Sequence, residues 1–103
     1  MKIWALAVAA LGLLAACTLA PAQEPWAPDL ARRLGCFACH SLGGRGGKTA
    51  APLDRVATRL APAQLQTILT HPRKLHAGAK MPSYAYLPAE ERQALADFLQ
   101  SLK

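Results

Sequence analysis

Apolar residues recur every three or four positions in four stretches of the chain, which is the spacing of amphipathic helices. These stretches are residues 28–35, 54–60, 62–70 and 88–102. The third begins at Pro62, a residue that suits the first turn of a helix, and carries Leu65, Ile68 and Leu69 on one face. The sequence contains no alternating strand pattern and no internal repeat. The pattern therefore predicts an all-α domain.

Glycine and proline mark the connections between these stretches. Residues 41–51 contain four glycines, and we expect them to form a loop. Residues 73–86 are interrupted by Gly78 and Pro82, so this stretch is predicted to be irregular. Gly35 ends the first helix or allows a tight turn after it.

A Cys-x-x-Cys-His motif, the attachment site of c-type haem, stands at Cys36, Cys39 and His40. The two thiols can each form a thioether with one vinyl group of a porphyrin, and the histidine can then ligate the iron. A structural zinc site needs four ligands, and only His71 and His76 remain as further candidates. A dithiol redox site would accompany a strand–helix–strand pattern, which this sequence lacks. The motif therefore predicts one covalently bound haem c.

The amino-terminal region has the character of an export signal. Lys2 precedes a short apolar run, as in a signal peptide. Residues 14–17 resemble a bacterial lipobox, in which Cys17 would carry lipid and become the first mature residue. Two alternatives stay open: cleavage after the Ala-Pro-Ala sequence at 20–22, or retention of the apolar residues 3–22 as a membrane span.

The cysteine count favours the lipobox. The chain has three cysteines, so Cys17 is left over once two are assigned to haem, and an odd cysteine in an exported protein needs an explanation. We expect residues 1–16 to be a signal peptide, residues 17–27 a proline-containing tether, and residues 28–103 the domain. The mature protein is then expected in the periplasm or on the outer side of the cytoplasmic membrane, held by a lipid anchor.

With these motifs in order, the chain resembles the class I monohaem cytochromes c of exported bacterial type. The resemblance covers residues 28–103 and rests on a first helix that leads into the haem motif, an Ala51-Pro52-Leu53 segment, a Lys80-Met81-Pro82 segment and a closing amphipathic helix. It implies the small cytochrome c fold, with three to four short helices packed around one haem.

The same resemblance implies roles for two further residues. Met81 corresponds to the distal iron ligand of the family, with His76 and His71 as alternatives. The backbone carbonyl of Pro52 corresponds to the group that accepts a hydrogen bond from the second nitrogen of His40 and fixes the ring.

The sequence also departs from the family, and two of its aromatics have open roles. Many members carry an aromatic residue in the first helix, where this chain has only aliphatic side chains, so that Phe98 in the last helix stands alone. Tyr84 and Tyr86 are candidates for a hydrogen bond to a haem propionate or for packing around the haem.

Charge points to a protein partner. The formal net charge is +6. The segment from residue 32 to residue 80 contains nine basic residues and a single acidic one, Asp54. Such a surface steers association with an acidic docking surface, here that of a redox partner such as a terminal oxidase or dehydrogenase. The alternative is a merely solvated basic face. The sequence has no nucleic-acid-binding motif, and we expect no small-molecule substrate.

These observations predict an electron-transfer protein whose iron cycles between Fe(III) and Fe(II). We expect no enzymatic activity, because protein side chains would fill both axial positions of the iron. Two alternatives remain: a haem c subunit of a larger oxidoreductase, such as a sulfur-oxidising or dehydrogenase complex, and a haem sensor in which Met81 is labile.

Overall fold

The structure is a computed structural model that describes residue 12 and residues 23–103. The predicted signal peptide, the lipidation of Cys17 and the alternative cleavage site all lie outside these described residues. In the part of the chain that is described, no helix combines the length and the apolar character needed to cross a bilayer.

The described chain is mostly helical, as the hydrophobic pattern predicts. The elements are α1 (Ala27–Arg33), α2 (Cys36–Cys39), β1 (Ser41–Leu42), β2 (Arg45–Gly46), α3 (Val56–Arg59), α4 (Pro62–Thr70), α5 (Pro72–Leu75) and α6 (Ala89–Gln100). The expectation of three to four helices is corrected in detail, because residues 23–103 contain six helical elements. Three of these, α2, α3 and α5, are only four residues long. The longer elements, α1, α4 and α6, match the predicted amphipathic stretches.

The hairpin of β1 and β2, like the short helix α5, is an element that the hydrophobic pattern did not predict. Ser41 pairs with Gly46 and Leu42 with Arg45 in antiparallel register. Gly43 and Gly44 form the turn with φ of 60° and 79°, left-handed values that favour glycine and suit a two-residue hairpin. Strands of two residues are too short for alternation to appear in a sequence, so this segment was expected to be a loop.

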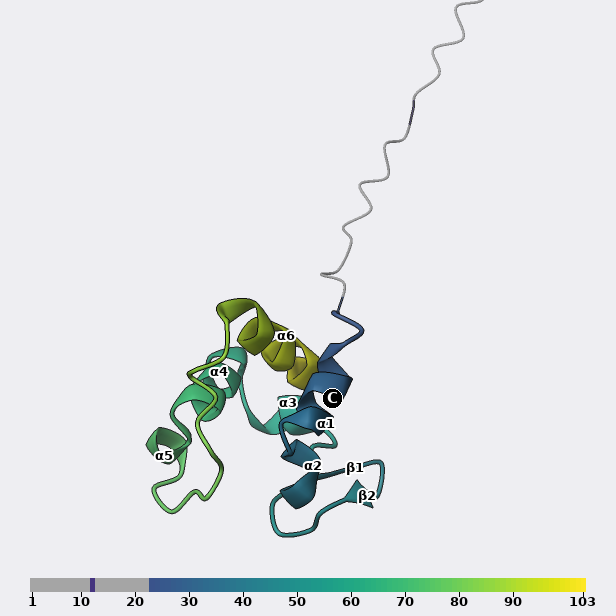
Figure 1. Cartoon of the computed structure of the whole chain (residues 1–103). Helices are drawn as coiled ribbons and strands as arrows, with labels where there is room; N and C mark the ends of the chain where they lie inside the picture. Colours follow the sequence, from purple (N-terminus) through teal and green to yellow (C-terminus); the bar gives the residue numbers. More distant parts are fainter. Residues whose placement is uncertain (1–11, 13–22) are drawn as a thin grey trace, which may run out of the picture.

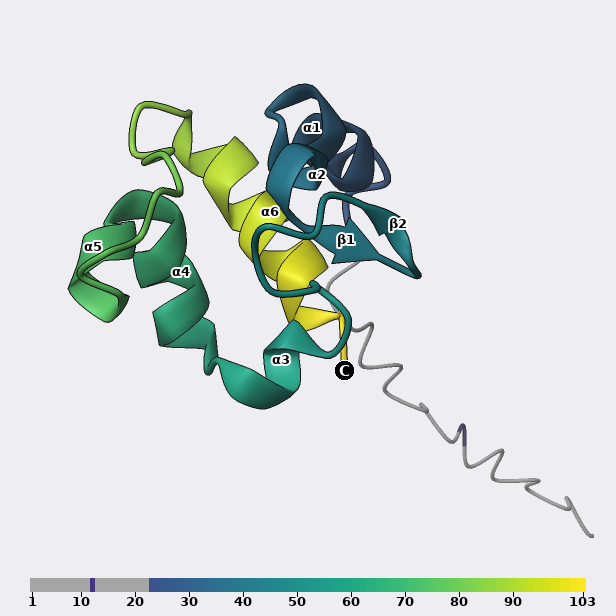
Figure 2. The same cartoon turned by 90° about the horizontal axis from the view of Figure 1, so that it is seen from below.

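Helix α6 is the central element of the domain and packs against both α1 and α4 (Figures 1 and 2). Leu30 of α1, Leu69 of α4 and Phe98 of α6 belong to one buried apolar cluster. Trp26 is half-buried against the same cluster, just before the start of α1 at Ala27. An aromatic residue thus packs on the core at the start of the first helix, one position before α1 itself.

Two groups of segments flank α6, and we name them by their content. The hairpin side consists of α2, β1, β2 and residues 47–55, and the loop side consists of α5 and residues 76–87. Both views show these groups on different sides of the molecule, with α6 above them in Figure 1 and between them in Figure 2. The haem motif is on the hairpin side and Met81 is on the loop side.

Candidate haem site

Helix α2 presents the two motif thiols. Gly35 precedes it with φ of 85°, a left-handed conformation that lets the chain turn sharply between α1 and α2. Cys36 and Cys39 are the first and last residues of α2, so they share one helical face, and both are free thiols. Cys36 is half-buried, whereas Cys39 is exposed. This arrangement fits attachment of one planar group along a single edge.

Tyr84 connects the loop side to the motif. Its side chain is 4% exposed, and its hydroxyl lies 3.4 Å from the Leu34 carbonyl, to which it donates. Burial, together with the neighbouring Cys36, raises the pKa of Tyr84 to about 12. Burial also raises the pKa of the Cys36 thiol, although a hydrogen bond with Tyr84 opposes this. The two roles considered for Tyr84 were a hydrogen bond to a haem propionate and packing around the haem, and its buried position matches packing. Tyr86 differs, because 73% of it is exposed.

His40 is oriented by a backbone carbonyl. Its Nδ1 lies 2.6 Å from the carbonyl oxygen of Ala51. This contact corrects the expectation that the Pro52 carbonyl faces the imidazole; the Pro52 carbonyl instead accepts a hydrogen bond from Arg59 at 2.7 Å. A proton on Nδ1 donated to Ala51 leaves the lone pair of Nε2 free for a metal.

Hydrogen bonds hold residues 50–54 against the end of the haem motif, the hairpin that follows it and Arg59. Two backbone bonds join Ala50 N to the Cys39 carbonyl at 3.0 Å and Leu53 N to the Ser41 carbonyl at 2.8 Å. The side-chain carboxylate of Asp54 accepts a hydrogen bond from Gly43 N at 3.0 Å. The backbone carbonyl of Asp54 accepts one from Arg59 Nη1, also at 3.0 Å. Arg59 and Asp54 are positioning residues that sequence reasoning counted only as charges. Their contacts span loops, so no spacing rule could have found them.

Two glycines allow the chain to return across α2. A Cβ atom at Gly47 would clash with the backbone of Ala38 and Cys39, and one at Gly46 would clash with the His40 carbonyl. Gly47 N also donates to the Phe37 carbonyl at 2.9 Å. The glycines of this segment are thus required for close packing against the haem motif, whereas the sequence indicated only a loop.

Among the three candidate distal ligands, Met81 is the least exposed. It is half-buried and packs against the core cluster, as do Cys36 and Phe37 of α2. His71 and His76 are both exposed, and Nδ1 of His71 lies 3.0 Å from the Thr70 hydroxyl. Neither histidine is gathered with the thiols, and in the described residues no group of three or more His, Cys, Asp or Glu is placed to hold a metal ion.

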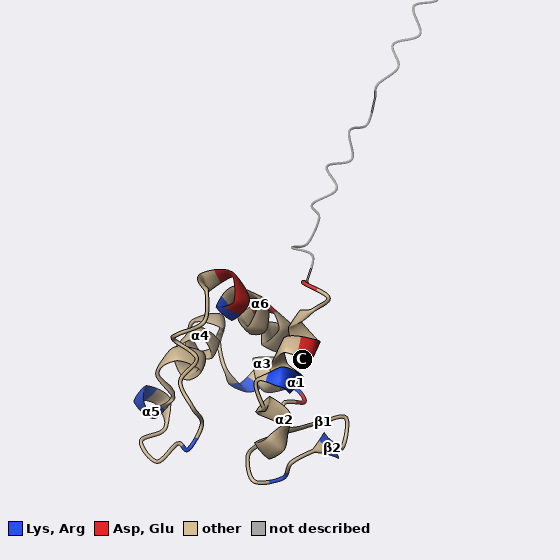
Figure 3. Ribbon diagram, in the orientation of Figure 1, with Lys and Arg blue, Asp and Glu red and all other residues tan. Residues whose placement is uncertain are grey.

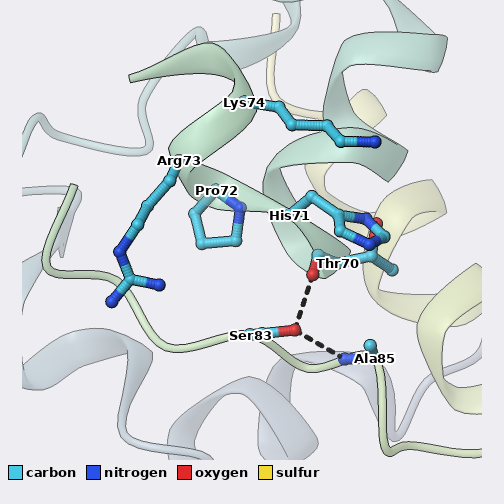
Figure 4. Close-up of a pocket in the computed structure, with 7 residues that line it drawn as sticks. All are labelled: Thr70, His71, Pro72, Arg73, Lys74, Ser83 and Ala85. Atoms are coloured by element: carbon cyan, nitrogen blue, oxygen red, sulfur yellow. Dashed lines mark hydrogen bonds between the residues drawn. The ribbon is translucent and has the colours of Figure 1, made fainter. Parts of the chain in front are cut away.

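A pocket of about 410 Å³ lies elsewhere, between the end of α4, α5 and residues 83–85 (Figure 4). It includes none of the motif residues and not Met81. The residues that fit a haem are instead the α2 thiols, the imidazole with one free nitrogen, and the half-buried apolar side chains beside them. This donor set suits a large apolar disc with an iron at its centre.

Residues 27–99 match the sequence profile of the family described as cytochrome c oxidase, cbb3-type, subunit III. The chain belongs to this family. The match confirms the resemblance to class I monohaem cytochromes c, and the chain accordingly binds one covalent haem c and takes part in haem-based electron transfer. Comparison with curated proteins gives no match. Cytochrome c domains of this kind are generally exported electron carriers that do not catalyse a reaction on their own.

Proposed function

We propose that this chain is a single-haem electron carrier in which His40 and Met81 are the axial ligands of the iron. The observation that carries the proposal is the position of Nδ1 of His40, 2.6 Å from the Ala51 carbonyl, which leaves Nε2 free. The half-buried thioether of Met81, beside the same apolar core, supplies the second donor. The haem supplies an iron that exchanges one electron between Fe(III) and Fe(II).

In this proposal each residue has a distinct task. Cys36 and Cys39 hold the haem through two thioethers, so the haem stays attached when the iron changes its charge. The Ala51 carbonyl fixes the ring of His40 and makes Nε2 a better donor. Ligation by Met together with His raises the reduction potential and leaves no axial position for a substrate, which favours a carrier over an enzyme.

The distal ligand can be tested by Met81→Ala. We expect the haem to remain attached, the reduction potential to fall, and exogenous imidazole to bind, because one axial position is opened. His76→Ala and His71→Ala serve as controls that remove the two alternative donors and should leave both properties unchanged. A Met81→Ala protein with the spectrum and potential of the parent would exclude Met81 as the ligand.

We also propose that the physiological partner presents an acidic surface and belongs to a terminal oxidase. Basic residues occur on the hairpin side, on the loop side and at the end of α1, whereas Glu90 and Glu91 lie in the first turn of α6 (Figure 3). The family description, a subunit of a cbb3-type oxidase, favours membership in an oxidase complex over a freely diffusing shuttle. Co-purification with oxidase subunits at fixed stoichiometry would support the complex, and recovery as a free monomer would support the shuttle.

For localisation we propose the periplasm or the outer side of the cytoplasmic membrane, with lipid on Cys17. The tether then ends at residue 25 rather than 27, because Trp26 packs against the core and Ala27 is the buried first residue of α1. The lipobox at residues 14–17 and the third cysteine support the lipid anchor. The mass of the intact mature protein should correspond to lipidated Cys17 as its first residue, and Cys17→Ser should move the protein from the membrane to the soluble fraction. A mature protein that begins at Gln23 would contradict the anchor.

A further inference from the structure

The residues that follow the proposed methionine ligand are tied to the carboxyl end of α4. Tyr84 N donates to the Leu69 carbonyl at 2.8 Å. The hydroxyl of Ser83 donates to the Thr70 carbonyl at 2.6 Å and accepts from Ala85 N at 3.2 Å (Figure 4). We call these three hydrogen bonds the α4 latch.

The stretch before the latch has little support of its own. Between residues 76 and 82, one backbone hydrogen bond is formed within the described chain, from Ala79 N to the His76 carbonyl at 2.9 Å. The other end of this stretch is attached to α5 through His76 N and the Pro72 carbonyl at 3.0 Å. The position of Met81 therefore depends on how firmly the two ends are held.

Ser83 is the part of the latch that depends on a side chain. The last carbonyls of a helix lack partners within the helix, and Thr70 is the last residue of α4. Only Pro82 separates Ser83 from Met81, and the ring of proline fixes its φ, so little slack remains between the two residues. If Ser83 moves away from Thr70, Met81 must therefore move with it.

We propose that Ser83 is a positioning residue that keeps Met81 within reach of the iron. Its hydrogen bond to the Thr70 carbonyl sets how often the stretch 76–82 swings away and opens the iron to an outside ligand. This inference rests on the proposed ligation by Met81. The latch holds the ligand in place and does not itself touch the haem.

The test compares Ser83→Ala with the parent holoprotein, using imidazole as the probe. An outside ligand that binds only the open form has an apparent affinity proportional to the open fraction. Ser83→Ala removes the bond to the Thr70 carbonyl together with the weaker bond from Ala85 N, and this loss at an exposed position should raise that fraction, and hence the imidazole affinity, by about two- to tenfold. The absorption band that reports iron–methionine bonding in the oxidised protein should weaken under the same conditions. Ser83→Thr retains the hydroxyl and should restore both properties.

Ser101→Ala is the matched control. The Ser101 hydroxyl donates to the Phe98 carbonyl at 2.5 Å, so the same substitution removes the same kind of bond at the end of α6. It should leave the imidazole affinity unchanged. Because Ser83 is exposed, its replacement by alanine creates no cavity, and the variant should fold.

The outcomes separate the latch from the ligand. If the parent shows the methionine band but Ser83→Ala binds imidazole no more tightly, the latch is overturned and ligation by Met81 stands. An equal rise in Ser101→Ala would likewise overturn the latch, because the effect would then be one of general stability. A parent without the methionine band would overturn both the ligation and the latch.

Discussion

The hairpin side and the loop side hold their candidate ligands by different means. On the hairpin side, His40 directly follows α2, and several short backbone contacts fix the segment that carries its carbonyl partner. On the loop side, Met81 lies in a stretch with one internal backbone hydrogen bond and depends on attachments at its ends. Segments with few such contacts open with smaller free energies than tightly connected ones. The comparison shows that the position of His40 is fixed by contacts close to it in the chain, whereas the position of Met81 depends on attachments at the two ends of its stretch.

The largest contrast should come from two glycines, one on each side. Gly47→Ala places a Cβ against the backbone of Ala38 and Cys39, whereas Gly78→Ala meets no atom within 4 Å. We expect Gly47→Ala to lower the free energy of unfolding by more than about 3 kcal/mol or to prevent haem attachment, since a rigid backbone cannot yield. Gly78→Ala should change stability by about 1 kcal/mol or less.

Denaturant unfolding of the two holoproteins, with haem staining of denaturing gels, measures both effects. Gly43→Ala is a useful second control on the hairpin side, because Gly43 has a left-handed φ of 60° but no close neighbour for a Cβ. If Gly47→Ala were as stable as Gly78→Ala, the hairpin side would be more compliant than its contacts indicate.

A smaller effect is expected from Arg59→Gln. This change weakens the hydrogen bonds to the carbonyls of Pro52 and Asp54, and thereby frees Pro52 to compete with Ala51 for Nδ1 of His40. Because the arginine is exposed, we expect a loss of about 1 kcal/mol in the free energy of unfolding. The proton resonance of His40 Nδ1 should shift.

Arg45→Gln is the matched control for this prediction, since Arg45 lies on β2, is exposed and forms no side-chain hydrogen bond or ion pair among the described residues. It should leave the His40 resonance in place. An unshifted resonance in Arg59→Gln would show that the Ala51 carbonyl is held by the backbone bonds alone.

The smallest effect concerns the surface charges of the two sides. Exposed charges act mainly on the association rate and are screened by salt, with a screening length of about 10 Å at 0.1 M. We expect Lys74→Glu with Lys80→Glu, on the loop side, to slow electron transfer to the acceptor by about two- to tenfold at low salt. The pair Arg45→Glu with Lys48→Glu tests the hairpin side in the same way.

Second-order rates measured over a range of ionic strength distinguish the two faces. The parent rate should fall as salt increases, while the reduction potential stays nearly constant. A loss confined to one double variant would assign docking to that side. A parent rate that does not fall with salt would show that the basic residues are only a solvated surface.

Much of the helical framework could be predicted from the sequence. The helix over residues 62–70 begins at a proline and ends before His71-Pro72, and the structure confirms these bounds, since proline fixes both ends through local sterics. The closing helix follows its apolar stripe in the same way. The short elements α5, β1 and β2 were missed, because a single turn or a pair of two-residue strands has too few positions to show a period.

The sequence by itself determined the haem chemistry. Cys36, Cys39 and His40 lie within five consecutive residues, so their spacing already brings two thiols and an imidazole to one place, whatever the rest of the chain does. Only the tertiary structure decided that the Ala51 carbonyl faces the imidazole, whereas the Pro52 carbonyl is turned toward Arg59. The same holds for the α4 latch, which joins Ser83 to Thr70 across thirteen positions. Contacts of this kind depend on how separate segments pack against one another. Hydrophobic periodicity reports which face of a helix is buried, and it does not specify which backbone carbonyl a distant side chain will contact.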